Sequence, residues 1–296
     1  MALDLPPLRS IDLDGPVSYR AWDGPADTTF LLIHGLGGSH LNWVQVAPGL
    51  AGIGRVLAVD LPGFGRSPLA GRHAGLMDLR RLLGAFLREQ ATGKVVVAGN
   101  SMGGAVAILL AAVEPELVDG LVLTCSALPW SRGAIPHPLV AAGFAITDTP
   151  GLGDAFVSVR LRHLSPERIV QMGLLISTAD PRQIPEEIVQ LHVELVREQR
   201  HDPEAPTAFI QAARSLLRLG RRPEIAHRAM DGVVCPVLLL HGRLDRLVPV
   251  RAAEAALARY PAWRGRIFPD LGHVPQMESP GRWLAEVADW VPTALR

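Results

Sequence analysis

The 296 residues of this chain include only two cysteines, Cys125 and Cys235, without the spacing of a disulfide framework. We expect both thiols to be buried and reduced at the margins of strands. No uncharged apolar run approaches the length of a membrane span, and the first residues lack the basic and apolar regions of a secretory signal. These absences predict a cytoplasmic protein with no integral membrane segment.

An excess of charge of one sign is also missing, because 29 basic residues balance 29 acidic residues. This balance argues against nucleic acid or another polyanion as a partner. The sequence has no internal repeat and no low-complexity segment, and 48% of its residues are apolar. A chain of this length and composition can bury a large core, which is consistent with one α/β domain that carries an insertion.

Strand and helix patterns alternate up to about residue 124 and resume at residue 233. The residues between them show helical patterns and no strand pattern. These helical patterns cover residues 139–144, 165–176, 185–199 and 207–219. The sequence therefore predicts a first core segment over 1–126, a helical insertion over 127–229 and a second core segment over 230–296.

Ser101 lies in the motif Gly99-Asn100-Ser101-Met102-Gly103-Gly104, between a predicted buried strand at 94–98 and a predicted apolar helix at 105–112. A serine at so sharp a turn adopts strained backbone angles, and the glycines on either side leave room for it. This is the G-x-S-x-G pattern of a nucleophile elbow, with a strand before it and a helix after it. Ser101 is therefore the predicted nucleophile, in preference to a serine in an ordinary glycine-rich turn.

A serine nucleophile needs a base and a carboxylate that orients the base. Asp245 follows the apolar run at 236–242, and His273 follows a short predicted strand at 265–268. The segment between Asp245 and His273 has room for one helix and one strand, which returns the chain to the same edge of the sheet. We therefore predict Asp245 as the acid and His273 as the base, in the chain order that this elbow requires.

Other acids and histidines fit these roles less well. Asp270 is too close to His273 in sequence to face it from another loop, and Asp119 precedes its strand. His34 and His241 each precede a glycine at a strand end, where a ring more often supports a turn. The remaining seven histidines lie in predicted loops or in the insertion, so only His273 follows the last strand downstream of an acid.

Acyl transfer also needs hydrogen-bond donors for the developing oxyanion. One predicted donor is the backbone N–H of Met102, at the start of the helix after the elbow. The second is the backbone N–H of Leu36, in the glycine-rich loop at 34–39 that follows an early strand. We expect the side chains of Leu36 and Met102 to form an apolar wall of the acyl pocket.

Five motifs, taken together and in this order, resemble those of the α/β-hydrolase superfamily over nearly the whole chain. They are His-Gly-Leu-Gly-Gly at 34–38, Val-Asp-Leu-Pro-Gly-Phe-Gly-Arg-Ser at 59–67, Gly-Asn-Ser-Met-Gly-Gly at 99–104, Gly-Arg-Leu-Asp at 242–245 and Gly-His at 272–273. The resemblance implies a mostly parallel central sheet flanked by helices, with a helical cap inserted after the sixth strand. It also implies that residues 60–63 form a structural turn at the pocket rim.

A cap at this position covers the mouth of the pocket, so residues 127–229 are expected to set the size of the substrate. Apolar side chains on the predicted cap helices favour a hydrophobic substrate, although about half of them are expected to pack the cap's own core. These side chains are Leu139, Val140, Phe144, Phe156, Met172, Leu175, Ile176 and Phe209.

The serine itself argues against haloalkane dehalogenases and epoxide hydrolases, which use aspartate at the elbow. Epoxide opening in this superfamily also relies on cap tyrosines, and Tyr19 and Tyr260 both lie outside the predicted cap. The resemblance therefore implies a serine hydrolase that cleaves a small hydrophobic carboxylic ester through an acyl-enzyme. This chemistry requires no metal and no organic cofactor.

Two alternatives stay open. The elbow resembles that of hydrolases that cleave carbon–carbon bonds in ring-fission products of aromatic catabolism. This chain departs from those enzymes in its oxyanion loop, in Val274 where they carry tryptophan, and at 185–192, where leucine and histidine stand in place of a cap arginine. The other alternative is a non-catalytic ligand-binding protein on the same fold.

Overall fold

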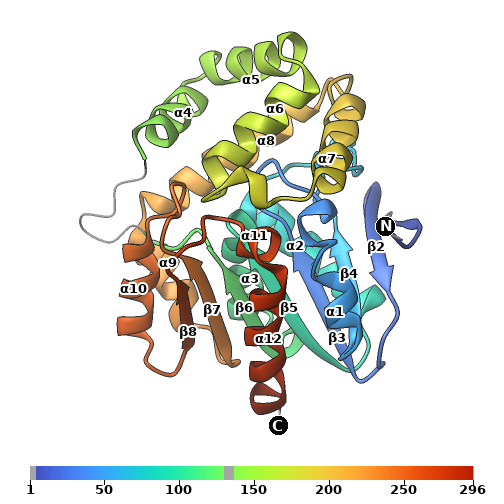
Figure 1. The fold of residues 1–296 in the computed structure, drawn as a ribbon, viewed down its shortest axis with the longest axis vertical. Helices are drawn as coiled ribbons and strands as arrows, with labels where there is room; N and C mark the ends of the chain where they lie inside the picture. Colours follow the sequence, from blue (N-terminus) through green and yellow to red (C-terminus); the bar gives the residue numbers. More distant parts are fainter. Residues whose placement is uncertain (1–4, 130–136, 296) are drawn as a thin grey trace.

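The computed structural model describes residues 5–129 and 137–295. A central eight-stranded sheet has the strand order β1-β2-β4-β3-β5-β6-β7-β8 (Figure 1). Its strands are β1 (Leu8–Asp12), β2 (Pro16–Trp22), β3 (Thr28–Ile33), β4 (Arg55–Val59), β5 (Lys94–Asn100), β6 (Gly120–Thr124), β7 (Val237–Gly242) and β8 (Arg264–Phe268). The pairs β1–β2 and β2–β4 are antiparallel, and all other pairs are parallel.

The central strands are buried on both faces, which explains their continuous apolar sequence. In β3, Phe30 and Leu32 point to one face of the sheet, while Leu31 and Ile33 point to the other. Each face has its own hydrophobic cluster, and all four of these side chains are fully buried. The sheet is therefore the middle of three layers.

Helices cover both faces of the sheet (Figure 1). The cluster that contains Leu31 includes side chains from α2 (Leu76–Gln90), α3 (Met102–Val113) and α10 (Val250–Arg259). The cluster that contains Phe30 includes side chains from η1 (His40–Trp43), α1 (Ala47–Ala51), α11 (Pro275–Glu278) and α12 (Pro280–Ala294). Trp283 of α12 is fully buried and donates its indole N–H to Thr124 Oγ1 at 3.0 Å, which fixes α12 to the end of β6.

A group of helices between β6 and β7 lies over one edge of the sheet (Figure 1). It consists of α4 (Pro138–Asp148), α5 (Leu152–His163), α6 (Pro166–Ser177), η3 (Pro181–Gln183), α7 (Glu186–Gln199) and α8 (Ala205–Gly220). The next helix, α9 (Pro223–Asp231), packs against α3 of the core as well as α8. The expected end of the insertion at residue 229 therefore falls inside α9.

These elements agree with most of what the sequence predicted for the core. The fold class is confirmed, with a mostly parallel sheet and helices on both faces. The helices α5 and α9 were not predicted.

Cys125 is buried as expected, but Cys235 is only partly buried because it lies in the segment just before β7. No described helix is both long enough and apolar enough to cross a bilayer.

Candidate active site

Ser101 occupies a strained corner between β5 and α3. Its backbone angles are φ 55° and ψ −118°, and a positive φ is uncommon for a residue with a Cβ atom. The corner is held by the Ser101 N–H, which donates to Thr124 O at 3.1 Å, and by the Ser101 carbonyl, which accepts the N–H of Ala127 at 3.0 Å. Strain of this kind persists only where the surrounding structure imposes it, and it concentrates at functional sites.

Two glycines of the motif allow the close packing behind this corner. A Cβ atom on Gly103 would lie 2.3 Å from Ile33 O and 2.6 Å from His34 O, at the end of β3. A Cβ atom on Gly99 would lie 2.4 Å from Gly103 O. Any larger residue would push α3 away from the sheet, so the spacing of the motif follows from the packing.

Asp245 and His273 come together from the loops that follow β7 and β8. His273 Nδ1 lies 2.7 Å from Asp245 Oδ2, and both side chains are buried. Asp245 Oδ1 accepts the backbone N–H groups of Leu247 at 2.8 Å and Val248 at 2.9 Å. Because a carboxylate only accepts, we assign the proton to His273 Nδ1, which leaves Nε2 as the acceptor.

The surroundings of Asp245 favour its ionised form. Burial alone would raise the pKa of this carboxyl, but attraction to His273 and the hydrogen bond from its ring lower the pKa below its usual value. His241 adds to this effect, because its Nε2 lies 3.5 Å from Asp245 Oδ2. Burial in turn lowers the pKa of His241. The carboxylate is thus charged and is held by several donors.

The competing residues have other partners. Asp270 forms an exposed ion pair with Arg282, at 2.8 and 3.0 Å, and Asp119 accepts the N–H of Val95. His34 Nε2 accepts the backbone N–H of Leu61 at 3.0 Å, so this ring supports the chain after β4. These contacts place the competing groups in structural roles.

The turn at 60–63 is held by a fully buried pair. His40 Nδ1 lies 2.9 Å from Asp60 Oδ2, and Asp60 also accepts the backbone N–H groups of His40 and Arg66. No sequence motif indicated that His40 and Asp60 would pair. Their contacts agree with a structural turn beside the site.

The loop that carries Leu36 touches the corner at Ser101. A Cβ atom on Gly35 would lie 3.0 Å from Ser101 Cβ, so the two segments are in contact. Among the described residues, neither the N–H of Leu36 nor that of Met102 has an acceptor. Both donors are thus available at this corner. The Leu36 side chain lines the adjacent cavity, whereas the Met102 side chain is fully buried in the core, so the expectation that Met102 forms a pocket wall was wrong.

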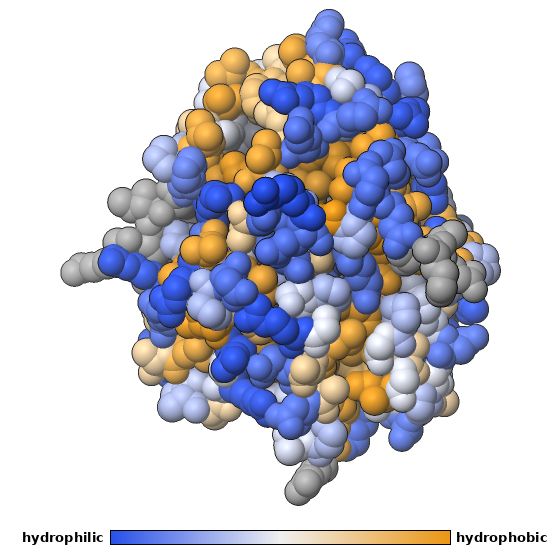
Figure 2. All heavy atoms as spheres, viewed as in Figure 1, coloured by the Kyte–Doolittle hydropathy of each residue, from blue (hydrophilic) through white to orange (hydrophobic). Residues whose placement is uncertain are grey.

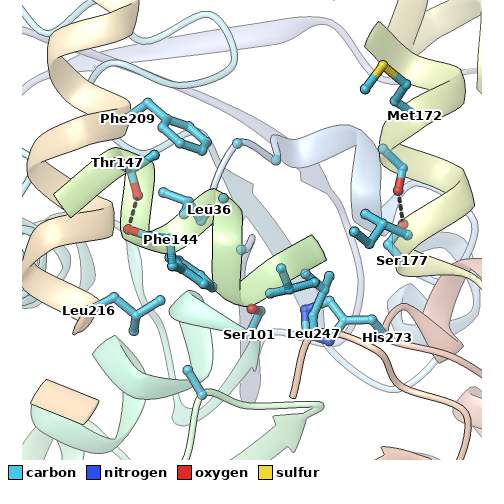
Figure 3. A pocket seen from close by; sticks show the side chains of 18 of the residues that line it. Leu36, Ser101, Phe144, Thr147, Met172, Ser177, Phe209, Leu216, Leu247 and His273 are labelled. Carbon is cyan, nitrogen blue, oxygen red and sulfur yellow. Dashed lines mark hydrogen bonds between the residues drawn. The ribbon is translucent and has the colours of Figure 1, made fainter. Parts of the chain in front are cut away.

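A cavity of about 1030 Å³ separates the helical insertion from the sheet and is lined by Ser101 and His273. Figure 3 shows these two residues at the bottom of the view, with Leu36, Phe144 and Phe209 above them. Within the described residues the Ser101 hydroxyl makes no hydrogen bond to His273, and catalytic hydrogen bonds often form only once substrate is bound. All eight apolar side chains expected from the insertion line the cavity, namely Leu139, Val140, Phe144, Phe156, Met172, Leu175, Ile176 and Phe209.

The His273 loop is also tied to the insertion through the end of α6. The His273 N–H donates to Ser177 O at 2.7 Å. Glu278 accepts the N–H of Gly272 at 2.9 Å and the N–H of Ala179 at 2.6 Å, so one carboxylate joins both segments. The sequence motifs contained no signal for Glu278.

Arg246, next to Asp245, makes a second link to the same end of α6. Its Nη1 donates to the carbonyl oxygens of Leu175 at 2.8 Å and Thr178 at 2.9 Å. The loops that carry Asp245 and His273 are therefore both bonded to residues 175–179 of the insertion.

One group of potential metal ligands occurs among the described residues, formed by Cys125, His241 and Asp245. The pKa of the Cys125 thiol is raised well above its usual value, mainly by burial and to a smaller extent by the negative charge of Asp245. The Cys125 sulfur also accepts the N–H of Gly242 at 3.4 Å. A protonated thiol and a carboxylate bonded to His273 are poor ligands for a cation.

Known proteins resemble the chain in both sequence and structure. It is 31% identical to the dihydrolipoyllysine-residue acetyltransferase component of the acetoin cleaving system of Cupriavidus necator, over 90% of this chain but only 64% of that protein. It is 30% identical to the pimeloyl-(acyl-carrier protein) methyl ester esterase of Aeromonas hydrophila, over 88% of this chain and 94% of the esterase.

Two solved structures show the same fold at lower sequence identity. The haloalkane dehalogenase DbeA from Bradyrhizobium elkani is 23% identical, with a TM-score of 0.80 over 97% of this chain and 98% of that chain. A thermophilic esterase from Thermogutta terrifontis is 24% identical, with a TM-score of 0.70 over 98% of this chain and 100% of that chain. The sequence model of the alpha/beta hydrolase fold matches residues 28–280, and the chain therefore belongs to the alpha/beta hydrolase fold family.

Proposed function

We propose that this protein is a serine hydrolase that cleaves carboxylic esters with an apolar acyl or alcohol group. The observation that carries the proposal is the buried hydrogen bond of 2.7 Å between His273 and Asp245, beside a strained serine at a nucleophile elbow. The similarity to a methyl ester esterase supports ester hydrolysis as the reaction. The proposed catalytic residues are Ser101, His273 and Asp245.

The proposed reaction starts with attack of Ser101 Oγ on the ester carbonyl. His273 Nε2 takes the serine proton, and Asp245 holds the ring and stabilises the resulting imidazolium. The backbone N–H groups of Leu36 and Met102 bind the oxyanion of the tetrahedral intermediate. His273 then returns the proton to the leaving alcohol, and it later activates the water that hydrolyses the acyl-enzyme.

We further propose that residues 127–229 act as a cap that selects the substrate. The cavity beneath these helices is lined mainly by apolar side chains, as in many sites for small molecules. Figure 2 shows apolar atoms gathered on the upper left of the molecule, where Figure 1 places α4 and α5. Leu139, Phe156 and Met172 of the insertion are exposed and also line the cavity. An apolar rim of this kind suits the entry of a hydrophobic chain.

A fluorophosphonate probe tests whether Ser101 is an activated nucleophile. Labelling should map to Ser101 in the folded wild-type protein and should be absent in Ser101→Ala, whereas Ser10→Ala, a change at an exposed serine of β1, should leave it intact. An unlabelled Ser101 would favour a non-catalytic ligand-binding protein.

The reaction class needs a second measurement. A panel of p-nitrophenyl esters should be assayed beside a vinylogous ring-fission dienoate. Turnover of the esters supports the proposal. Strong turnover of the dienoate, with negligible activity on every ester, would instead favour carbon–carbon bond hydrolysis.

A further inference from the structure

Arg160 on α5 lines the cavity without a partner of opposite charge. Its Nε atom is buried and has no hydrogen-bond partner, and no ion pair to Arg160 is found among the described residues. Three arginines of the insertion and the segment after it form ion pairs with carboxylates. They are Arg197 with Glu167, Arg214 with Asp154 and Arg221 with Asp148.

An unpaired cation in this position is unfavourable for the protein alone. Burial lowers the pKa of Arg160, because the low-dielectric surroundings disfavour its charged form. A guanidinium nevertheless stays protonated at physiological pH, so the charge is retained and a bound anion would compensate it. Arg160 therefore has the properties of a ligand-binding group rather than of a structural ion pair.

The rest of the cavity strengthens this interpretation. None of the described lining residues is an aspartate or a glutamate, so no carboxylate in that wall repels an anion. The other lining arginine, Arg246, donates to the carbonyl oxygens of Leu175 and Thr178 and serves to hold the insertion. Of the two arginines that line the described part of the cavity, Arg160 is therefore the one whose side chain has no hydrogen-bond or ion-pair partner among the described residues.

Arg160 and Ser101 lie in different layers of the molecule. Helix α5 packs on α4, α6 and α8 within the insertion, and Figure 1 shows it at the side of the insertion that is remote from the sheet. Ser101 lies at the end of β5. Apolar side chains such as Phe144 and Phe156 line the same cavity.

We propose that Arg160 binds an oxyanion, a carboxylate or a phosphate, at the end of the substrate that is remote from the scissile ester. This inference rests on the proposed ester hydrolysis at Ser101. The substrate class is then an amphipathic ester, in which an apolar segment joins the ester carbonyl to the anionic group. The planar guanidinium can form two parallel hydrogen bonds to such a group, which gives both affinity and orientation.

The test compares matched substrates in three proteins. Each p-nitrophenyl alkanoate is paired with esters of the same chain length that end in a carboxylate or in a phosphate. The proteins are the wild type, Arg160→Met and Arg162→Met, because Arg162 is an exposed arginine of the same helix that does not line the cavity. Circular dichroism melting establishes that each variant is folded.

The measured quantity is the ratio of kcat/KM for the anionic ester to kcat/KM for its neutral partner. We expect Arg160→Met to lower this ratio roughly 10- to 100-fold, mainly through KM, as for loss of a hydrogen bond to a charged group. Arg162→Met should keep the wild-type ratio. In the wild type, the anionic group that gives the larger ratio, carboxylate or phosphate, is the one that Arg160 binds. An equal ratio in the wild type and Arg160→Met overturns the proposal.

A binding measurement separates this inference from the proposed reaction. Titration calorimetry of Ser101→Ala with a long-chain dicarboxylate and with an alkyl phosphate requires no turnover. We expect binding that is weakened by at least tenfold when Arg160→Met is added. If the wild type hydrolyses no ester, the proposed reaction is wrong, and the titration alone decides the anion site. If esters are hydrolysed but neither anion binds, only the anion site is wrong.

Discussion

Asp245 uses its two carboxylate oxygens for different partners. Oδ2 accepts from the His273 ring, and Oδ1 accepts from the backbone N–H groups of Leu247 and Val248. In the Asp245→Asn variant the amide carbonyl oxygen would stay with the backbone donors, so the amide NH₂ would face His273. The ring would then have to accept at Nδ1 and carry its proton on Nε2, where it could not act as a base.

We therefore expect Asp245→Asn to lower kcat by up to roughly 10⁴-fold while the melting temperature stays close to that of the wild type. Steady-state kinetics on a p-nitrophenyl ester would measure the effect. Asp270→Asn is the matched control, because that carboxylate pairs with Arg282 at the surface. A larger loss in Asp270→Asn than in Asp245→Asn would move the acid to residue 270.

His192 on α7 is expected to make the free energy of unfolding depend on pH. The pKa of His192 is lowered from 6.5 to about 4, mainly by burial and to a smaller extent by the nearby charge of His40. Its Nε2 is buried with no hydrogen-bond partner among the described residues. In the unfolded chain the ring takes up a proton near its ordinary value, so acidification between these two pKa values favours unfolding.

The free energy of unfolding should therefore fall by about 1–3 kcal/mol from this residue as the pH drops from 6.5 towards 4. Urea unfolding at several pH values, on the wild type and His192→Leu, measures the contribution. The loss on acidification should be smaller in His192→Leu. The same change at His201, which is exposed, should leave the pH profile as it is in the wild type. Identical profiles for His192→Leu and the wild type would contradict the prediction.

At the scale of elements, the contact between α3 and the end of β3 determines the position of Ser101. Gly103→Ala would bring a Cβ atom to 2.3 Å from Ile33 O, so α3 and the elbow would have to move. We expect a loss of about 1–3 kcal/mol in the free energy of unfolding, together with a large loss of kcat. Gly281→Ala in α12 is the matched control, since nothing lies within 4 Å of its added methyl group and Gly281 does not line the cavity. A Gly103→Ala protein with wild-type stability and kcat would contradict this account.

The sequence predicted the core elements more completely than the insertion. The strands β5 and β7 are continuous apolar runs because the sheet is covered on both faces, so their positions were predicted to within two residues. Helix α5 was missed because its apolar residues do not lie on one buried face. Val157 is buried and Phe156 lines the cavity, whereas Leu152 and Val159 are each 54% exposed. Such a pattern lacks the periodicity of an amphipathic helix.

The candidate site was predictable where it depends on the order of the strands. Parallel strands end at one edge of the sheet, so the loops after β5, β7 and β8 had to lie near one another. Contacts that cross from the insertion to the core leave no such signal. The hydrogen bonds of Glu278 to Ala179 and Gly272, and the unpaired position of Arg160, depend on packing between distant segments.

At the scale of the whole molecule, the cavity between the insertion and the sheet predicts how activity depends on chain length. Each additional methylene that is buried contributes at most about 0.8 kcal/mol, or roughly fourfold in kcat/KM. Activity on p-nitrophenyl esters should therefore rise from acetate to medium-chain esters and then level off where the acyl chain reaches the end of the cavity. A flat profile would show that the cavity does not receive the acyl chain.

The links from residues 175–179 to the loops of Asp245 and His273 have a consequence for protein engineering. Ser177 O accepts the His273 N–H, Ala179 donates to Glu278, and Arg246 donates to Leu175 O and Thr178 O. A chimera that exchanges the whole insertion for that of a relative would replace these partners and disturb the register of both loops. Grafts that keep residues 175–179 and exchange α4 and α5 alone should alter substrate range while they conserve the catalytic geometry.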